Sequence, residues 1–119
     1  MTGGQMAPTS LIGQVTTTSP YGRQVDQAGY PIRMSEMLAT LDGAVYIERV
    51  SVHDIRHIAR AKRAIKKSFE LQIAGKGFSL VEVLSTCPTN WGMSPLESLD
   101  WLKDNMIPYY PLGVKKEAE

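Results

Sequence analysis

The chain has 119 residues, of which 43% are apolar, and its 13 Lys and Arg against 12 Asp and Glu leave a formal net charge of +1. This length fits one small domain with a real core, and the near-neutral charge does not indicate a nucleic-acid-binding protein. The single cysteine excludes an intrachain disulfide framework, and no apolar run approaches the ~20 residues that span a bilayer. Without a secretory-type apolar segment near the start, we expect a cytoplasmic location and no membrane partner.

Residues 1–30 form the first segment, which is dense in Gly, Thr, Ser and Pro and has no sustained periodicity. It opens on Thr2-Gly3-Gly4-Gln5, where adjacent glycines between polar side chains suit a backbone that approaches an anion closely. Because the chain starts inside such a loop, we expect part of the site to lie on residues upstream. Long segments without regular structure are usually functional or disordered, so a ligand or subunit surface and a flexible arm both remain open.

Residues 31–106 have the pattern of an α/β core. Periodicity predicts a short helix over 32–41, a strand over 44–50, a long helix over 55–74 capped by Asp54, and a second strand over 78–84. Strand, long helix and strand make a βαβ unit, so we expect parallel strands joined by a right-handed crossover.

The segment after the second strand contains a further helix start. Ser94-Pro95-Leu96-Glu97 is a capping box with Pro at the first helical position, which predicts a helix to about Met106. The prolines that follow predict an extended arm over 107–119. Since two parallel strands alone leave both sheet edges open, further strands must come from residues 1–30 or from a neighbouring chain. We favour the neighbouring chain and therefore an oligomer.

The loop over 85–93 is the second candidate site, because ligands in open α/β sheets bind beyond the carboxyl ends of the strands. It carries Cys87 within Ser85-Thr86-Cys87-Pro88-Thr89-Asn90-Trp91-Gly92. A thiolate is a soft ligand that suits iron–sulfur clusters, but one cysteine supplies only one of the usual four positions. From spacing alone, an inert buried thiol is the more common situation.

Four phrases, in this order and separation, carry a family resemblance: Thr2–Gln5, Thr18–Gly22, Tyr46–Arg49 and Ser85–Gly92. With them the chain resembles the C-terminal half of the β subunit of thiamine-diphosphate-dependent 2-oxoacid:ferredoxin oxidoreductases. The resemblance covers almost the whole chain and implies a partial thiamine-diphosphate-binding-type domain. It divides the chain into a cofactor and subunit arm over 1–30, an α/β core over 31–106 and a tail over 107–119.

The resemblance also implies cofactors: thiamine diphosphate, magnesium and a [4Fe-4S] cluster. It gives Thr2, Gly3, Gly4 and Gln5 a cofactor contact, and it makes Cys87 the last ligand of the cluster. The implied partners are the other subunits of the complex, ferredoxin, a 2-oxoacid and coenzyme A, with acyl-CoA as the product.

The chain departs from the family pattern in ways that bear on activity. It has no Gly-Asp-Gly with its downstream Asn pair, none of the first three cluster cysteines, and no visible general base. We therefore expect no catalytic residue among these 119 and no activity of the isolated chain.

Other interpretations remain open beside the enzyme. Arg56, Arg60, Arg63 and Lys67 share one face of the long helix and could dock ferredoxin or coenzyme A, although a solvated helix face is more common. A non-catalytic α/β module for subunit interaction is the alternative function. A nucleic-acid module is a weaker choice, since the basic helix has no interleaved aromatic residues.

The two histidines of the chain, His53 and His57, are four residues apart and could share one helix face as metal ligands do. No third ligand is evident beside them in the sequence. Ordinary surface histidines are therefore the favoured interpretation.

Overall fold

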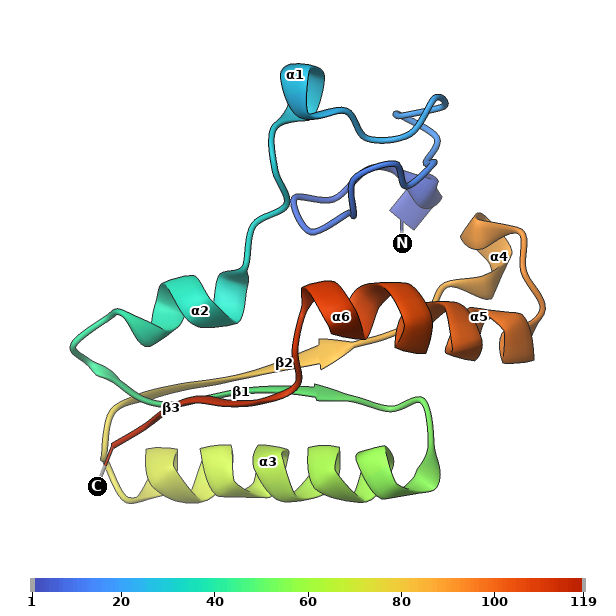
Figure 1. The fold of residues 1–119 in the computed structure, drawn as a ribbon. Helices are drawn as coiled ribbons and strands as arrows, with labels where there is room; N and C mark the ends of the chain where they lie inside the picture. The colour runs from blue at the N-terminus through green and yellow to red at the C-terminus, as the bar shows by residue number, and fades with distance from the viewer. Residues whose placement is uncertain (1, 119) are drawn as a thin grey trace. The chain divides into compact units, whose positions relative to one another are not determined.

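The computed structural model describes residues 2–118, which form two compact units (Figure 1). The first unit contains residues 2–33 and 86–101, and the second contains residues 34–85 and 102–118. No helix in this described part of the chain is both long and apolar enough to cross a bilayer.

A three-stranded sheet with the order β2-β1-β3 is the centre of the second unit. β1 (Ala44–Ser51) pairs in parallel with β2 (Phe78–Leu84) and antiparallel with β3 (Gly113–Glu117). α3 (Ile55–Ile73) connects β1 to β2 along one face of the sheet, and α2 (Met34–Ala39) lies on the other side (Figure 1). The predicted βαβ unit with parallel strands is confirmed.

The small core of this unit explains how closely α3 approaches the sheet. Val50, Ala61 and Ala64 are buried together, with Val81 packed against them. Alanine carries no atoms beyond Cβ, so the helix backbone can lie near the strands. Phe69, farther along the same helix, is 62% exposed and lies outside this core.

The third strand corrects the expected source of further strands, because it comes from residues 113–117 of this chain and not from residues 1–30 or a neighbouring chain. The helix predicted to end near Met106 ends in a π-helical turn, Leu102–Met106. Residues from 107 on, predicted as an extended arm, instead form α6 (Ile107–Tyr109) and then β3. Pro108 is tolerated because it lies in the first turn of α6, where a backbone N–H has no helical partner. The end of β3 is held by Ala118, whose N–H donates to the Val45 carbonyl at 2.8 Å.

A buried arginine ties the elements of the second unit together. The Arg49 side chain is fully buried and donates to Glu36 at 2.8 and 2.5 Å, to Glu82 at 2.9 Å and to the Pro111 carbonyl at 3.2 Å. Its guanidinium also lies 5.1 Å from the centre of the Tyr110 ring. Hydrogen bonds from Arg49 lower the pKa of Glu36. The sequence pattern assigned these charged residues no role in the fold.

The first unit contains short helices joined by long loops. They are η1 (Thr2–Gly4), α1 (Val25–Ala28), α4 (Pro88–Trp91) and α5 (Pro95–Trp101). The predicted capping box opens α5: the Ser94 N–H donates to Glu97 Oε2 at 2.8 Å, and the Glu97 N–H donates to Ser94 Oγ at 3.3 Å.

Arg23 organises the N-terminal part of this unit. Only 4% of Arg23 is exposed, and its guanidinium lies inside a ring of backbone carbonyls. It donates at 2.9–3.1 Å to the carbonyl oxygens of Ala7, Pro8, Ser10, Ala28, Gly29 and Tyr30. The segment without periodicity is therefore an ordered loop region, in which a side chain supplies the bonds that helices and strands would otherwise supply.

Candidate functional site

The two candidate site segments come together in the first unit. Gly4 has φ +68°, and a Cβ at this position would stand 2.9 Å from Asn90 Oδ1 and 3.0 Å from Thr17 Cγ2. Gly3 also has a positive φ, +62°. A side chain at residue 4 would therefore meet α4 directly, so the paired glycines allow the loop to approach the segment that carries Cys87.

The Thr2–Gln5 loop is also bonded to the Thr16–Gly22 loop. Thr17 donates from Oγ1 to the Gly3 carbonyl at 2.9 Å and from its N–H to the Gly4 carbonyl at 2.9 Å. The Met6 N–H donates to Thr18 Oγ1 at 2.9 Å. Three of the four phrases that carry the resemblance are thus joined in one unit.

Cys87 lies at the start of α4, immediately before Pro88. Its carbonyl accepts from the Trp91 N–H at 3.0 Å, and its Sγ accepts from Asn90 Nδ2 at 3.3 Å. The Asn90 side chain, followed by the Asn90 backbone N–H, lowers the pKa of the Cys87 thiol. Cys87 is partly exposed, which differs from the inert buried thiol kept as the alternative. An accessible thiol with a lowered pKa suits a metal ligand or a nucleophile.

Trp91 contributes an unsatisfied donor next to this cysteine. Its Nε1 is buried without a hydrogen-bond partner among the described residues, and its ring packs at 4.7 Å from the ring of Trp101. A buried indole N–H normally finds an acceptor. The α4 segment therefore presents both a polarised thiol and a donor without an acceptor.

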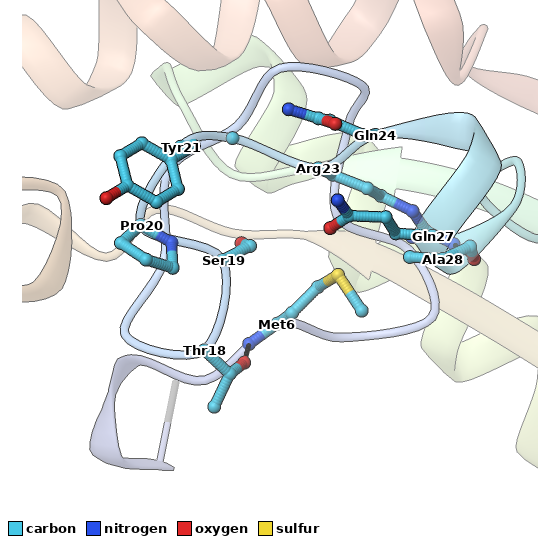
Figure 2. A pocket seen from close by; sticks show the side chains of 10 residues that line it. Met6, Thr18, Ser19, Pro20, Tyr21, Arg23, Gln24, Gln27 and Ala28 are labelled. Carbon is cyan, nitrogen blue, oxygen red and sulfur yellow. Dashed lines mark hydrogen bonds between the residues drawn. The ribbon is translucent and has the colours of Figure 1, made fainter.

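An open pocket of about 270 Å³ lies beside the same loops. Figure 2 shows Tyr21 and Pro20 at one side and Gln27 and Ala28 at the other, with the Met6 thioether between them. The lining mixes apolar surface with amide and hydroxyl groups, as small-molecule sites commonly do. The sequence did not single out this pocket, because two of its lining residues, Met6 and Gln27, are far apart along the chain.

The implied cofactors fit the described residues only in part. Cys87 can supply one of the four cysteine positions of a [4Fe-4S] cluster, and it is the single cysteine of the chain. Within residues 2–118, the one group of three or more His, Cys, Asp and Glu side chains that could hold an ion includes neither Cys87 nor the Thr2–Gln5 loop. These residues alone complete neither the ligand set of the cluster nor a binding site for magnesium and the diphosphate.

Comparison with known proteins identifies relatives over almost the whole chain. The ketoisovalerate oxidoreductase subunit VorA of Methanothermobacter thermautotrophicus is 51% identical over 112 residues, which are 94% of this chain and 24% of that protein. The chain is homologous to subunits of 2-oxoacid oxidoreductases. The 2-oxoglutarate synthase subunit KorB is 40% identical in Archaeoglobus fulgidus and 37% identical in Methanothermobacter marburgensis, over 88% and 90% of this chain and 35% of each relative.

The chain thus spans between about a quarter and a third of the length of these relatives. No protein-family model and no solved structure matches it. Because the matched part of each relative is small, the activity of the whole relatives does not transfer to this chain by homology alone.

The basic face of α3 is smaller than the sequence suggested. Arg56, Arg60 and Arg63 are exposed, whereas Lys67 forms an ion pair with Glu117 of β3 and lies 4.9 Å from the Tyr46 ring. Lys67 is therefore part of the packing between α3 and the sheet. The docking of ferredoxin or coenzyme A on the three arginines stays a prediction.

Proposed function

We propose that the chain forms part of the thiamine-diphosphate-binding β subunit of a 2-oxoacid:ferredoxin oxidoreductase. In this function Thr2, Gly3, Gly4 and Gln5 lie against the cofactor, and Cys87 is one ligand of a [4Fe-4S] cluster. When bound, the cofactor would supply the chemistry of 2-oxoacid decarboxylation, and the cluster would supply electron transfer towards ferredoxin. The residues that bind magnesium and the remaining cysteine ligands of the cluster belong to other parts of the complex.

The observation that carries this proposal is the contact chain from Gly4 to Cys87. The Asn90 side chain is 2.9 Å from the position of a Cβ on Gly4, and it donates to Cys87 Sγ at 3.3 Å. A loop suited to a diphosphate and a thiol suited to a cluster therefore share one side chain. That adjacency is what an enzyme needs if electrons leave the cofactor for a nearby cluster, and homology to VorA and KorB supports the same family of reactions.

In the assembled enzyme each residue has a limited role. The positive-φ glycines leave room for the anionic cofactor to approach the backbone, and Asn90 keeps the Cys87 thiolate accessible and oriented by donating to it. Trp91 Nε1 is available to an acceptor on another segment of the subunit. None of these groups is assigned the role of an acid or base in this proposal.

The alternative function, a non-catalytic subunit-interaction module, has its own supporting observation. Ile55 and Ile73 at the two ends of α3 are 86% and 85% exposed, and Phe69 is 62% exposed. Exposed apolar residues on one helix are typical of a surface that packs against another protein segment. An oxidoreductase subunit also needs such a surface, so the distinction between the functions rests on cofactor chemistry.

The test is reconstitution with companion polypeptides that carry Gly-Asp-Gly and Cys-x-x-Cys. The assay measures 2-oxoacid-dependent reduction of a viologen dye, carbon dioxide release and the electron paramagnetic resonance signal of the reduced cluster. We expect no dye reduction by the isolated chain and restored dye reduction in the complex. Cys87→Ser should reduce electron transfer more than carbon dioxide release and should weaken the cluster signal, whereas Ser85→Ala, a nearby exposed position, should leave both unchanged.

Three results would contradict the proposal. Robust dye reduction by the isolated chain would show that it contains a complete site. Full electron transfer and an unaltered cluster signal in the Cys87→Ser complex would remove Cys87 from the cluster. Assembly of the complex without thiamine diphosphate binding or dye reduction would favour the interaction module.

A further inference from the structure

A cluster of three potential metal ligands lies where β1 leads into α3, in the second unit. His53, Asp54 and His57 each offer one ligand atom, and these atoms all lie within 4.8 Å of one another. His53 precedes the helix, because Asp54 is the N-cap of α3 and accepts from the His57 N–H at 2.8 Å. The expectation that two histidines share a helix face without a third ligand is therefore corrected by the turn, which adds a carboxylate.

The first histidine is already oriented by a neighbour. Ser51 is buried at the end of β1, and its Oγ lies 2.8 Å from His53 Nδ1. This contact leaves Nε2 as the nitrogen that faces Asp54, at 3.4 Å from Oδ2. A ligating histidine usually has its second ring nitrogen held in this manner by a partner outside the metal site.

The second histidine has a nitrogen that is left unsatisfied. His57 Nδ1 is buried and completes no hydrogen bond, although Asp54 Oδ1 lies 2.8 Å away. Its ring faces that of His53 with centroids 4.1 Å apart. Two imidazole rings and a carboxylate thus converge, and the 2.8 Å contact between His57 Nδ1 and Asp54 Oδ1 lacks hydrogen-bond geometry.

We propose that His53 Nε2, Asp54 and His57 Nδ1 bind a divalent first-row transition metal of the zinc class, with the remaining position open to water. Two nitrogens and one carboxylate oxygen suit this class of ion better than magnesium or calcium, which prefer oxygen ligands. Ligand atoms about 2.0–2.2 Å from one tetrahedral ion stand roughly 3.3–3.6 Å apart. The three ligand atoms lie within 4.8 Å of one another, so side-chain rotations that bring them closer would complete the site. The proposal is independent of the oxidoreductase function.

The charges around the cluster are compatible with a cation. The backbone N–H of His57, followed by its ring, lowers the pKa of Asp54 to about 2, which leaves a carboxylate at neutral pH. Burial, followed by the charge of His57, lowers the pKa of His53 and favours the neutral ring that a metal requires. Lys103 also faces His53 and lowers its pKa, and the same positive charge would weaken rather than favour the binding of a metal ion. The metal would clamp the turn between strand and helix.

The test titrates zinc and cobalt into chelator-treated chain that carries Cys87→Ser, which removes the one competing thiol. Calorimetry gives the zinc stoichiometry and affinity, and cobalt absorption in the visible range reports the ligand set. We expect one ion per chain, with affinity at least ~10-fold weaker for His57→Gln and for Asp54→Asn, and about 10-fold weaker for Ser51→Ala, which removes only the orienting contact. Glu97→Gln is the matched control, because it also neutralises a carboxylate at a helix start and should leave zinc affinity unchanged.

Circular dichroism without metal separates binding from folding. Asn is as good an N-cap as Asp, so Asp54→Asn should retain the helix and decides the matter if His57→Gln unfolds. Loss of zinc binding with unchanged helix content supports the site. Absence of saturable zinc binding by the Cys87→Ser chain, or zinc affinity that Asp54→Asn does not change, overturns it.

Discussion

Replacing Gly4 by alanine tests whether the glycine loop and the cysteine are physically coupled. The added Cβ would lie 2.9 Å from Asn90 Oδ1 and 3.0 Å from Thr17 Cγ2, both closer than van der Waals contact allows. The obstacles are ends of side chains, so Asn90 can rotate away rather than force the backbone apart. We expect this rotation to break the hydrogen bond from Asn90 Nδ2 to Cys87 Sγ.

The cost of the substitution has two contributions that a control can separate. An alanine at φ +68° costs roughly 1–2 kcal/mol of backbone strain, and displacing Asn90 or Thr17 from a favoured rotamer adds about 0.5–1.5 kcal/mol. Gly92, at the end of α4, has φ 65° and ψ 33° and nothing within 4 Å of its added Cβ. Gly92→Ala, in the segment that follows Cys87, is therefore expected to add the backbone strain without the steric clash.

The assay combines urea denaturation with the pH dependence of Cys87 alkylation. Since the Asn90 contact lowers the pKa of the thiol, Gly4→Ala should move the alkylation midpoint to higher pH, and Gly92→Ala should not. Gly4→Ala should also lose more free energy of unfolding than the control. Equal stability losses together with identical alkylation profiles would refute the coupling of the two segments through Asn90.

Two further perturbations test the buried arginines. Arg49→Met should lower the free energy of unfolding, measured in urea, by about 3 kcal/mol. This value is at the lower end of the losses seen when one partner of a buried ion pair is removed, because the Glu36 side chain remains 36% exposed. Arg49→Lys should lose less free energy of unfolding than Arg49→Met. Because folding lowers the pKa of Glu36, its carboxylate contributes to the free energy of unfolding above pH ~4.5, and this contribution is lost as the pH falls further. Arg49→Met should therefore make the free energy of unfolding depend less on pH in that acidic range. Arg23→Lys keeps the charge but cannot reach six carbonyls, and we expect chymotrypsin to cleave after Tyr21 faster than in an Arg60→Lys control. Equal cleavage rates would contradict this role.

The regular elements were predictable because each is determined by local signals. Asp54, an amphipathic run and two β-branched runs predicted the βαβ unit, and the Ser94–Glu97 box predicted the start of α5. The exposure of Phe69 was not predictable, because helical periodicity indicates a face but not how far the partner sheet extends. The position of β3 was missed for a related reason: the prolines before it predict an interruption, not the place where the chain resumes.

The candidate site was predictable only at the level of residue types. The glycine pair and Cys87 stand out in the sequence, but no spacing rule indicates that Asn90 lies between them, since their contact joins segments more than eighty residues apart. Arg23 carried no signal either, because its partners are main-chain carbonyls that any sequence would offer. The sequence identified Asp54 as a helix cap. It did not indicate that the same carboxylate lies beside the two imidazole rings of His53 and His57.

The contact chain from Gly4 through Asn90 to Cys87 should couple the Thr2–Gln5 loop and the Cys87 thiol, so that a change at either one affects the other. Whatever moves the Thr2–Gln5 loop changes the space available to Asn90, and Asn90 supplies the largest contribution that lowers the pKa of the Cys87 thiol. An anion bound at the loop would therefore alter the proton affinity of the sulfur, and protonation of the sulfur would alter the affinity of the loop for the anion by the same factor. In an enzyme that moves electrons from a diphosphate cofactor to an iron–sulfur cluster, such reciprocity would link occupancy of one site to the electronic state of the other. Alkylation profiles measured with and without pyrophosphate would show this linkage in the wild-type chain and lose it in Gly4→Ala.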